Sequence, residues 1–163
     1  MTPLPTGRRQ TGEPTPAPTG EPTPAPTATL LPTALCSTES AYAFNTGTLR
    51  TAVTAWCSNS TTAETTYGHI SCWDTSQVDD MSYLFSRYDE NGTDGGAYCS
   101  TCASFNEDIS RWNTSNVVSM HKMFQAAETF NSDVSSWDTS KVASLRYTFY
   151  LASAFNSDVS NWD

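Results

Sequence analysis

The chain has 163 residues and a formal net charge of −9, with 8 Lys and Arg against 17 Asp and Glu. This length is enough for one domain and a tail. An acidic chain lacks the basic face that nucleic acids require, and anionic membrane surfaces repel it. No apolar run reaches the roughly 18 residues of a membrane helix. We therefore expect neither nucleic-acid binding nor direct membrane insertion in this fragment.

Residues 1–33 are predicted to be a disordered Thr/Pro-rich stalk or linker. An octet, Thr-Gly-Glu-Pro-Thr-Pro-Ala-Pro, occupies residues 11–18 and recurs at 19–26. Prolines at this density hold a chain near polyproline II and remove backbone donors. Alternating Thr and Pro is typical of an O-glycosylated stalk, and a plain disordered linker is the alternative. No signal peptide is visible, and we expect that the natural N-terminus is missing.

Residues 34–68 are predicted to form an N-terminal cap. Apolar side chains recur at i, i+4 and i+7, one face of a helix, at Leu49, Val53 and Trp56. Thr46 or Thr48 could cap this helix. A second short helical segment is expected to end at Gly68. An array of repeats needs such a unit to cover its first apolar face.

Residues 69–163 hold about three and a half copies of a 25-residue repeat, the last of them cut off. Trp112, Trp137 and Trp162 follow one another at intervals of 25 residues. Trp73 precedes Trp112 by 39 residues, which places a 14-residue insert near 87–103. The glycines of this insert predict a surface loop. A fixed period of this length indicates a repeat architecture.

Each repeat is predicted to contain one short strand and one short helix. Helical spacing is followed by Val117, Met120, Met123, Phe124 and Ala127. The preceding Thr114-Ser115 pair would cap the helix. Residues 108–112 are rich in strand formers, and we expect a bend between Ile109 and Trp112. The predicted fold is an α/β solenoid, a leucine-rich-repeat-like stack of short parallel strands and helices.

Polar residues also recur with the period. One column holds Asn106, Asn131 and Asn156, a second holds Asp108, Asp133 and Asp158, and a third holds Asp74, Asn113, Asp138 and Asp163. Bonds from Asn side chains to the neighbouring backbone explain the first column. A following helix N-terminus would explain the third. Calcium is the alternative ligand of these oxygens, but no acidic loop has a known calcium spacing, so we expect no metal.

The repeat Phe-Asn-x-Asp-(Ile/Val)-Ser-x-Trp-(Asp/Asn)-Thr-Ser-x-Val resembles the BspA-like surface-protein repeat, the mycoplasma-type domain of unknown function 285. The segment from Leu49 to Cys57, followed by Tyr67-Gly-His-Ile-Ser, resembles the unit that opens such arrays in microalgal members. The resemblance covers residues 41–163. It implies a leucine-rich-repeat-like fold on cell surfaces with a role in binding or adhesion, and it carries no catalytic residues. The insert and the incomplete last repeat depart from the pattern.

Five cysteines are present, so they cannot all pair within the chain. We expect one or two disulfides, with Cys99 and Cys102 joined to each other or to Cys72. Cys36 is expected to remain unpaired. Free thiols are the alternative. Zinc held by Cys99 and Cys102 would need two further ligands, and no second close pair of Cys or His exists.

No catalytic constellation is visible, and no cofactor is expected. His69 and His121 stand alone, and the serines lack a recurring base partner. A glycan hydrolase that uses two carboxylates is the rival class. A catalytic pair should occur once in the chain. The acids that do not repeat are Asp89, Glu90 and Asp94, which fall in the glycine-containing loop.

We therefore expect a non-catalytic extracellular or cell-surface protein that binds a protein or glycan. A structural spacer of a wall or matrix is the alternative. The candidate binding residues are Tyr88, Tyr98, Arg111, Ser136 and Asn161. The first two are aromatic anchors beside the insert, and the other three vary where their neighbours are fixed. Candidate glycosylation sites are Asn59, Asn91 and Asn113, each of which begins an Asn-x-Ser/Thr sequon.

Overall fold

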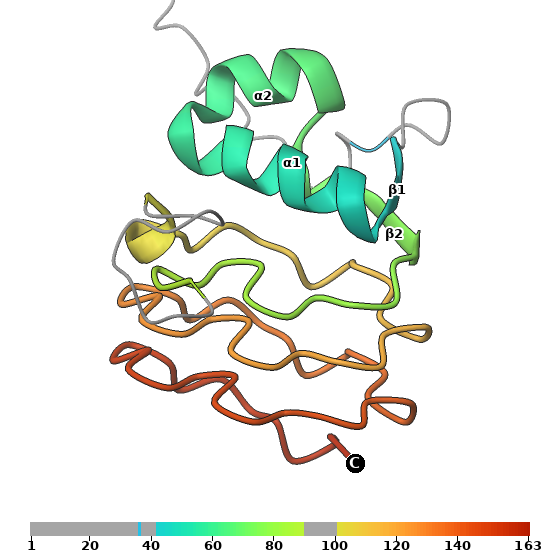
Figure 1. Cartoon of the computed structure of the whole chain (residues 1–163), viewed down its shortest axis with the longest axis vertical. Coiled ribbons are helices and arrows are strands. Elements are labelled where there is room, and N and C mark those ends of the chain that lie inside the picture. Colours follow the sequence, from blue (N-terminus) through green and yellow to red (C-terminus); the bar gives the residue numbers. More distant parts are fainter. Residues whose placement is uncertain (1–35, 37–41, 90–100) are drawn as a thin grey trace, which may run out of the picture.

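The structure is a computed structural model that describes residues 36, 42–89 and 101–163. Its regular elements, in chain order, are β1 (Ala43–Asn45), α1 (Thr46–Ser58), α2 (Ser60–Tyr67), the 3-10 turn η2 (Ile70–Cys72), β2 (Asp74–Gln77) and the 3-10 turn η3 (Cys102–Ser104). The two helices lie at one end of the molecule, and the repeats follow below them without further helices or named strands in the described residues (Figure 1).

The helix α1 forms where the apolar spacing predicted it. Its buried face contains Leu49, Ala52, Val53 and Trp56. The N-cap is Asn45, which the sequence prediction missed. Its side chain accepts the Thr48 N–H, and the Thr48 hydroxyl in turn accepts the Asn45 N–H. This reciprocal capping box satisfies two backbone donors at the exposed helix start.

The helix α2 packs against α1 through a single buried residue, Ala63. Asn59 is its N-cap and accepts the Thr62 N–H. The helix ends at Gly68, as predicted, where the backbone φ is 75°. A left-handed φ is accessible to glycine without a steric penalty, so the chain can turn there toward the first repeat.

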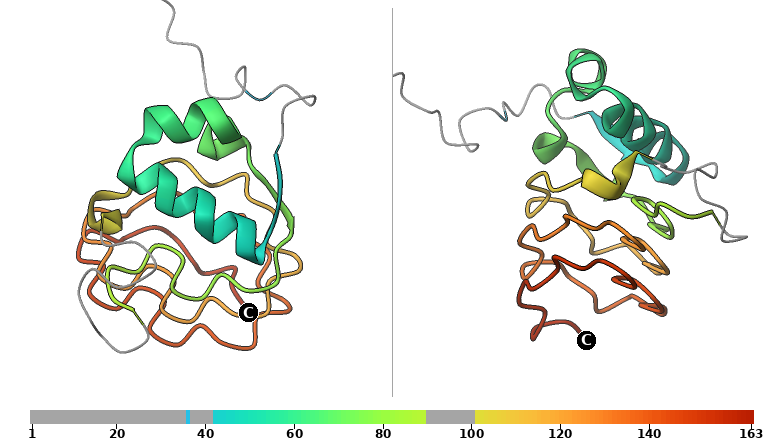
Figure 2. Two further views of the ribbon diagram at one scale, coloured as in Figure 1. Left: turned by 45° about the horizontal axis from the view of Figure 1, so that its top comes forward. Right: turned by 90° about the vertical axis from the view of Figure 1, so that its left-hand side faces the viewer.

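The strands β1 and β2 form a two-stranded parallel sheet in which Ala43 pairs with Asp74 and Asn45 pairs with Gln77. This sheet joins the segment before α1 to the first repeat. Figure 2 shows α1 lying across the end of the repeats, with β1 and β2 beside it.

The core is formed largely by aromatic rings that recur with the repeat. The Phe85, Phe124 and Phe149 rings follow one another at 5.3 and 5.5 Å between centroids. A second series lies beside the first and contains Phe105, Phe130 and Phe155, at 6.1 and 6.0 Å. All these neighbouring rings are close to parallel, with interplanar angles of 12° or less. Aromatic burial of this kind supplies much apolar contact area in a small domain.

The predicted α/β solenoid is wrong. The described residues contain two helices and one two-stranded sheet, all before residue 78, and the repeats form neither the predicted strand nor the predicted helix. Beyond β2, parallel pairing is reduced to isolated bridges, Asp80 with Ser119 and Ser119 with Ser144. The molecule is a small disulfide-bonded domain in which each copy of the repeat folds as a series of turns.

The backbone hydrogen bonds explain why the helix is absent. Between Met120 and Ala126, every second N–H donates to a carbonyl of the following copy, from Ser144 to Tyr150, at 2.8 to 2.9 Å. The N–H groups of Met123 and Gln125 instead close three-residue turns within their own copy. An α-helix would need all these donors for carbonyls four residues back. The apolar spacing that predicted a helix therefore occurs in a series of turns.

The predicted strand at 108–112 is replaced by a turn. The Trp112 N–H donates to the Ile109 carbonyl at 3.1 Å, which produces the bend that we expected between these residues. Both side chains are buried, with exposed fractions of 3% and 0%. The turn allows this because it breaks the alternation that would place them on opposite faces of a strand.

The column of asparagines behaves as predicted. The Asn131 N–H donates to Oδ1 of Asn106, and the Asn156 N–H donates to Oδ1 of Asn131, both at 2.7 Å. The column of Asp74, Asn113 and Asp138 has a different role from the predicted one, because no helix follows it. Each Oδ1 accepts the N–H of the serine two residues on, at 2.9 to 3.0 Å. These are Asx turns.

The disulfides differ from the predicted pairing. Cys36, expected to be unpaired, bonds to Cys72, and Cys57 bonds to Cys102. The expected bonds from Cys102 to Cys99 or Cys72 are therefore wrong, and Cys99 itself lies outside the described residues. Sequence proximity was misleading because the fold places η3 against the end of α1, which brings Cys57 within 5.3 Å of Cys102 between Cα atoms.

Candidate functional site

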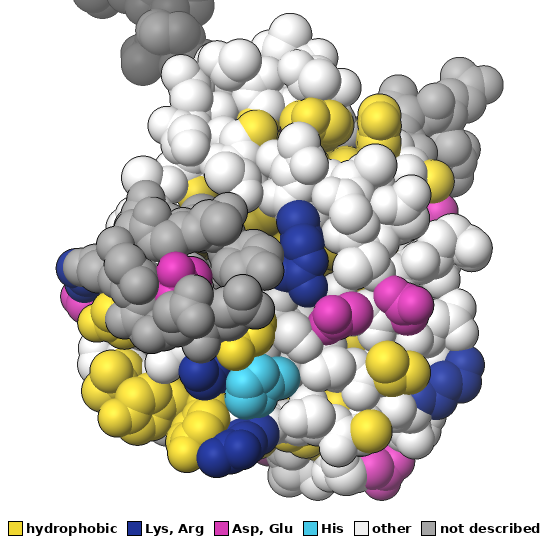
Figure 3. Space-filling view, in the orientation of Figure 1, with side chains coloured by type: hydrophobic (Ala, Val, Ile, Leu, Met, Phe, Trp, Pro, Cys, Tyr) yellow, Lys and Arg dark blue, Asp and Glu magenta, His cyan; other side chains and the backbone are white. Residues whose placement is uncertain are grey.

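Six side chains from three successive copies form an aromatic and basic surface, which we call the cationic tyrosine patch. Its members are Tyr83, His121, Lys122, Arg146, Tyr147 and Tyr150. Figure 3 shows basic side chains and a histidine gathered beside hydrophobic side chains on one face of the molecule. Tyr147 and Tyr150 are among the most exposed large apolar side chains, at 46% and 51%.

Hydrogen bonds between copies bring the patch together. The Tyr83 N–H donates to the His121 carbonyl, and the Lys122 N–H donates to the Arg146 carbonyl, both at 2.9 Å. The Tyr150 carbonyl in turn accepts the Ala126 N–H at 2.8 Å. The patch backbone is therefore fixed by the same contacts that hold the copies to each other.

The side chains of the patch contact one another directly. The His121 ring lies 5.3 Å from the Tyr83 ring and 6.3 Å from the Tyr147 ring, and the Tyr147 ring lies 5.6 Å from the Tyr150 ring. Lys122 Nζ is 5.2 Å from the centre of the Tyr83 ring. Arg146 Cζ is 4.8 Å from the centre of the Tyr147 ring. Both are cation–π distances, so each cation adjoins an aromatic surface.

A repeated backbone conformation accompanies these contacts. Tyr83, Lys122 and Tyr147 occupy the same position of three copies, and their φ values are 60°, 54° and 60°. Left-handed backbone is uncommon for residues other than glycine, and Asn tolerates it better than most. Because it recurs at each copy, we attribute it to the turn geometry that frees alternate N–H groups for the next copy.

Among the residues that the structure describes, no carboxylate pairs with the two central cations of the patch. Arg50 and Arg87 pair with Asp80 and Glu128, at 3.4 and 3.1 Å. Neither Lys122 nor Arg146 makes an ion pair within the described part of the chain. The patch is therefore a site of local positive charge on a chain with a net charge of −9.

The pKa shifts agree with that charge. Burial, followed by the charge of Lys122, lowers the pKa of His121 below its ordinary value of 6.5. The Arg146 guanidinium donates to the Tyr147 hydroxyl and lowers the pKa of Tyr147. The positive charges of Lys122 and Arg146 contribute to both shifts, although burial is the larger cause for His121.

A recess of about 290 Å³ lies within the patch and is lined by Lys122, Gln125, Tyr147 and Tyr150. Gln125 is only 8% exposed, and its Oε1 accepts a hydrogen bond from Ser86. The recess thus combines a cation, two phenol rings and an amide. This combination suits a ligand that is partly flat and apolar and partly polar.

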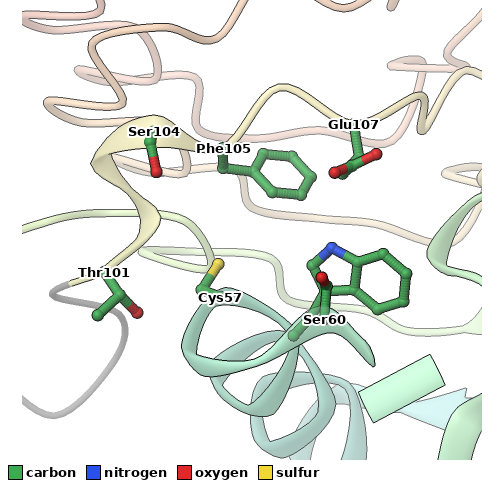
Figure 4. A pocket seen from close by; sticks show the side chains of 7 residues that line it. Cys57, Ser60, Thr101, Ser104, Phe105 and Glu107 are labelled. Atoms are coloured by element: carbon green, nitrogen blue, oxygen red, sulfur yellow. The ribbon is translucent and has the colours of Figure 1, made fainter. Parts of the chain in front are cut away.

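A second recess, of about 120 Å³, lies beside the disulfide between Cys57 and Cys102. Figure 4 shows Cys57 and Ser60 on one side of it and Phe105 and Glu107 on the other. No Lys, Arg or His lines it, so we do not take it as the functional site.

The binding residues predicted from the sequence do not form one cluster. Arg111, Ser136 and Asn161 are exposed at equivalent positions of successive copies, and the Ser136 hydroxyl donates to the Ser110 carbonyl at 3.0 Å. Tyr88 lies elsewhere, with the Arg87 guanidinium 6.0 Å from its ring centre. Tyr98 lies outside the described residues.

The predicted glycosylation sites are placed as follows. Asn59 is exposed between α1 and α2, and Asn113 is exposed in its Asx turn. Each uses Oδ1 as an acceptor, which leaves the amide nitrogen, the atom that a glycan would modify, outside these bonds. Asn91 lies outside the described residues.

The described residues contain neither a cluster of metal ligands nor a helix able to span a membrane. Within residues 42–89 and 101–163, together with Cys36, no three His, Cys, Asp or Glu side chains come together as metal ligands would. None of the helices in the same residues has the length and apolar character to cross a membrane.

Sequence reasoning missed the cationic tyrosine patch because it assigned these positions to the outer faces of helices. A signal was nevertheless present. The two residues that follow Met81, Met120 and Leu145 are Ser82-Tyr83, His121-Lys122 and Arg146-Tyr147. When the copies are aligned by the repeat, these pairs fall at the same two positions. Aromatic and basic residues are concentrated there, although the chain as a whole is acidic.

The turns, the recurring ring series and the two disulfides define a disulfide-bonded repeat domain that carries an exposed patch of tyrosines and cations. Residues 51–163 match the family model described as Mycoplasma protein of unknown function, DUF285. The match covers more than half of the chain, so the protein belongs to this family, as the repeat pattern predicted. The comparisons with curated proteins and with solved structures gave no match.

Proposed function

We propose that this protein is a non-catalytic extracellular binding module and that the cationic tyrosine patch is its contact surface. The observation that carries the proposal is a pair of cations, Lys122 and Arg146, that make no ion pair within the described residues. Lys122 lies over the half-buried Tyr83 ring, and Arg146 lies over the exposed Tyr147 ring. Tyrosine and arginine are the residue types enriched where proteins contact their partners. The partner is a protein or a glycan of a cell surface or matrix.

The covalent chemistry supports the proposed location. Two disulfides join segments that are 36 and 45 residues apart. Disulfides persist in oxidising compartments and are rare in the cytosol. They therefore support an extracellular or surface location for this domain.

The test is a binding screen of the oxidised chain against immobilised extracellular proteins and glycans. One variant, Lys122→Gln with Arg146→Gln, removes the charges of the patch. A matched variant, Arg111→Gln with Lys141→Gln, removes two exposed cations outside it. We expect the first variant to bind its partner about tenfold more weakly than the wild type, or worse. The second variant should keep the affinity of the wild type.

Two outcomes would overturn the proposal. Binding that is lost in the Arg111 and Lys141 variant and kept in the patch variant would move the contact surface to the edge that carries Arg111. Turnover of a glycan or peptide by the purified protein, abolished by changing one acid, would make the protein an enzyme.

A further inference from the structure

The geometry of the cationic tyrosine patch restricts the class of ligand that could bind there. Lys122 and Arg146 lie on adjacent copies, and their rows are joined by the hydrogen bond from the Lys122 N–H to the Arg146 carbonyl. Their charges are not compensated within the described residues. Charge complementarity therefore points to a ligand that carries negative groups in pairs.

The rings beside the cations restrict the ligand further. The Tyr147 and Tyr150 rings are about half exposed and meet at 62°, so each presents its own surface. The negative face of an aromatic ring attracts C–H groups, which carry small positive charges. A sugar ring that bears a carboxylate offers both features, because its axial C–H groups can lie on a phenol ring while its carboxylate reaches the adjacent cation.

The recess has a suitable size and chemistry for one such ring. Its volume of about 290 Å³ is close to the lower end of ligand pockets, roughly 300 Å³, so it suits a single sugar ring better than a larger ligand. Gln125 supplies an amide at its edge, and the hydroxyl groups of a sugar can both donate to it and accept from it.

The charge around the patch disfavours dense polyanions. Asp80 pairs with Arg50 and acts electrostatically on His121. Glu128 pairs with Arg87, whose N–H donates to the carbonyl of the recess residue Gln125. Duplex DNA carries one charge per about 1.7 Å along its axis, so it would bring several phosphates against these acids. A polymer with one carboxylate per sugar places fewer charges on the same surface.

An acidic peptide is also a weaker fit. Peptides commonly bind by adding a strand to an open sheet edge. In the patch, the N–H groups of Lys122, Phe124 and Ala126 already donate to the carbonyls of Arg146, Thr148 and Tyr150. This row of N–H groups is therefore not open to an added peptide strand.

We propose that the cationic tyrosine patch binds an acidic polysaccharide, with sugar rings on Tyr147 and Tyr150 and sugar carboxylates on Lys122 and Arg146. This assignment rests on the proposed function and names the ligand class for the same site.

The experiment measures binding of the oxidised full chain to polygalacturonate and to the same polymer after reduction of its carboxylates to alcohols. Dextran sulfate, which carries sulfates and no carboxylates, single-stranded DNA and polyglutamate are the competing polyanions. Arg146→Gln and Lys122→Gln test the charges. Tyr147→Asn tests the ring, because Asn keeps the left-handed backbone accessible. Lys141→Gln is the control, since this exposed lysine lies outside the patch and donates to Asn116. Near-ultraviolet circular dichroism checks that each variant keeps its packed aromatic core.

We expect the reduced polymer to bind about tenfold more weakly than polygalacturonate or worse, and each patch variant to lose about fivefold to tenfold. The Lys141→Gln variant should stay within about twofold of the wild type. A patch-dependent preference for the reduced polymer, a protein or another polyanion would overturn the ligand class and leave the binding module standing. Absence of patch-dependent binding in the whole panel would overturn both.

Discussion

The indole N–H of Trp112 donates to the backbone carbonyl of Ile70, 42 residues earlier in the chain, at 2.9 Å. The same bond joins Trp137 to Ile109 at 3.2 Å and Trp162 to Val134 at 3.1 Å, each 28 residues apart. The 14 extra residues before Trp112 therefore leave this contact between copies unchanged. Each tryptophan fills the space between two copies and also fixes their register.

The first prediction concerns this bond and the volume around it. Trp137→Ala should lower the free energy of unfolding by about 3–5 kcal/mol, because the ring is buried and leaves a cavity. Trp137→Phe keeps much of the volume and loses the N–H, so it should cost about 1–3 kcal/mol. Urea denaturation monitored by circular dichroism measures both. A Trp137→Phe variant as stable as the wild type would contradict a separate role for the hydrogen bond.

The second prediction concerns the column of asparagines. Asn131→Ala removes the acceptor of the Asn156 N–H and should destabilise the protein by about 1 kcal/mol. Asn131→Asp keeps that acceptor and should restore most of the loss. Ser132→Ala is the neighbouring control, because the side chain of Ser132 makes no such bond in this column. If Asp were as costly as Ala when measured at neutral pH, the side-chain bond would not be the cause.

The third prediction concerns the pH dependence of stability at the Asx turn of Asp138, with the equivalent turn of Asn113 as the reference. Hydrogen bonds from the side chain and then the backbone of Ser140 lower the pKa of Asp138 below 3.8. Its contribution to stability is therefore present above pH 3.8 and is lost as the pH falls through the lower, folded-state pKa. Asp138→Asn should fold normally, because Asn113 makes the equivalent turn in the preceding copy. The variant should lose less stability than the wild type between pH 4 and about pH 2, as followed by thermal melts. Parallel losses in the two proteins would remove Asp138 from the acid response.

The fourth prediction concerns the disulfides. Peptide mapping of the oxidised protein without reduction should recover the pairs Cys36–Cys72 and Cys57–Cys102. Replacing both Cys57 and Cys102 by Ser should lower stability by about 2–4 kcal/mol, because the bond closes a loop of 45 residues in the unfolded chain. A peptide that joined Cys99 to Cys102 would show that the pairing described here is wrong.

The sequence alone determined the period, the family and the residues that recur as a core. Trp, Phe and Asn at fixed spacing identify the contacts between copies, and the amphipathic spacing of Leu49, Val53 and Trp56 correctly predicted α1. These features were readable because each depends on local spacing, which the chain carries in one dimension.

Only the tertiary structure decided what the repeated segment becomes. The spacing from Val117 to Ala127 suits a helix and a series of turns equally well, since both bury every third or fourth side chain. The choice depends on whether the N–H groups bond within a copy or to the next copy, as those of Met120 and Lys122 do. The pairing of Cys57 with Cys102 and the meeting of Lys122 with Arg146 likewise join segments distant in sequence. Such contacts are set by how the copies pack, so the aligned aromatic and basic positions became a single surface only in three dimensions.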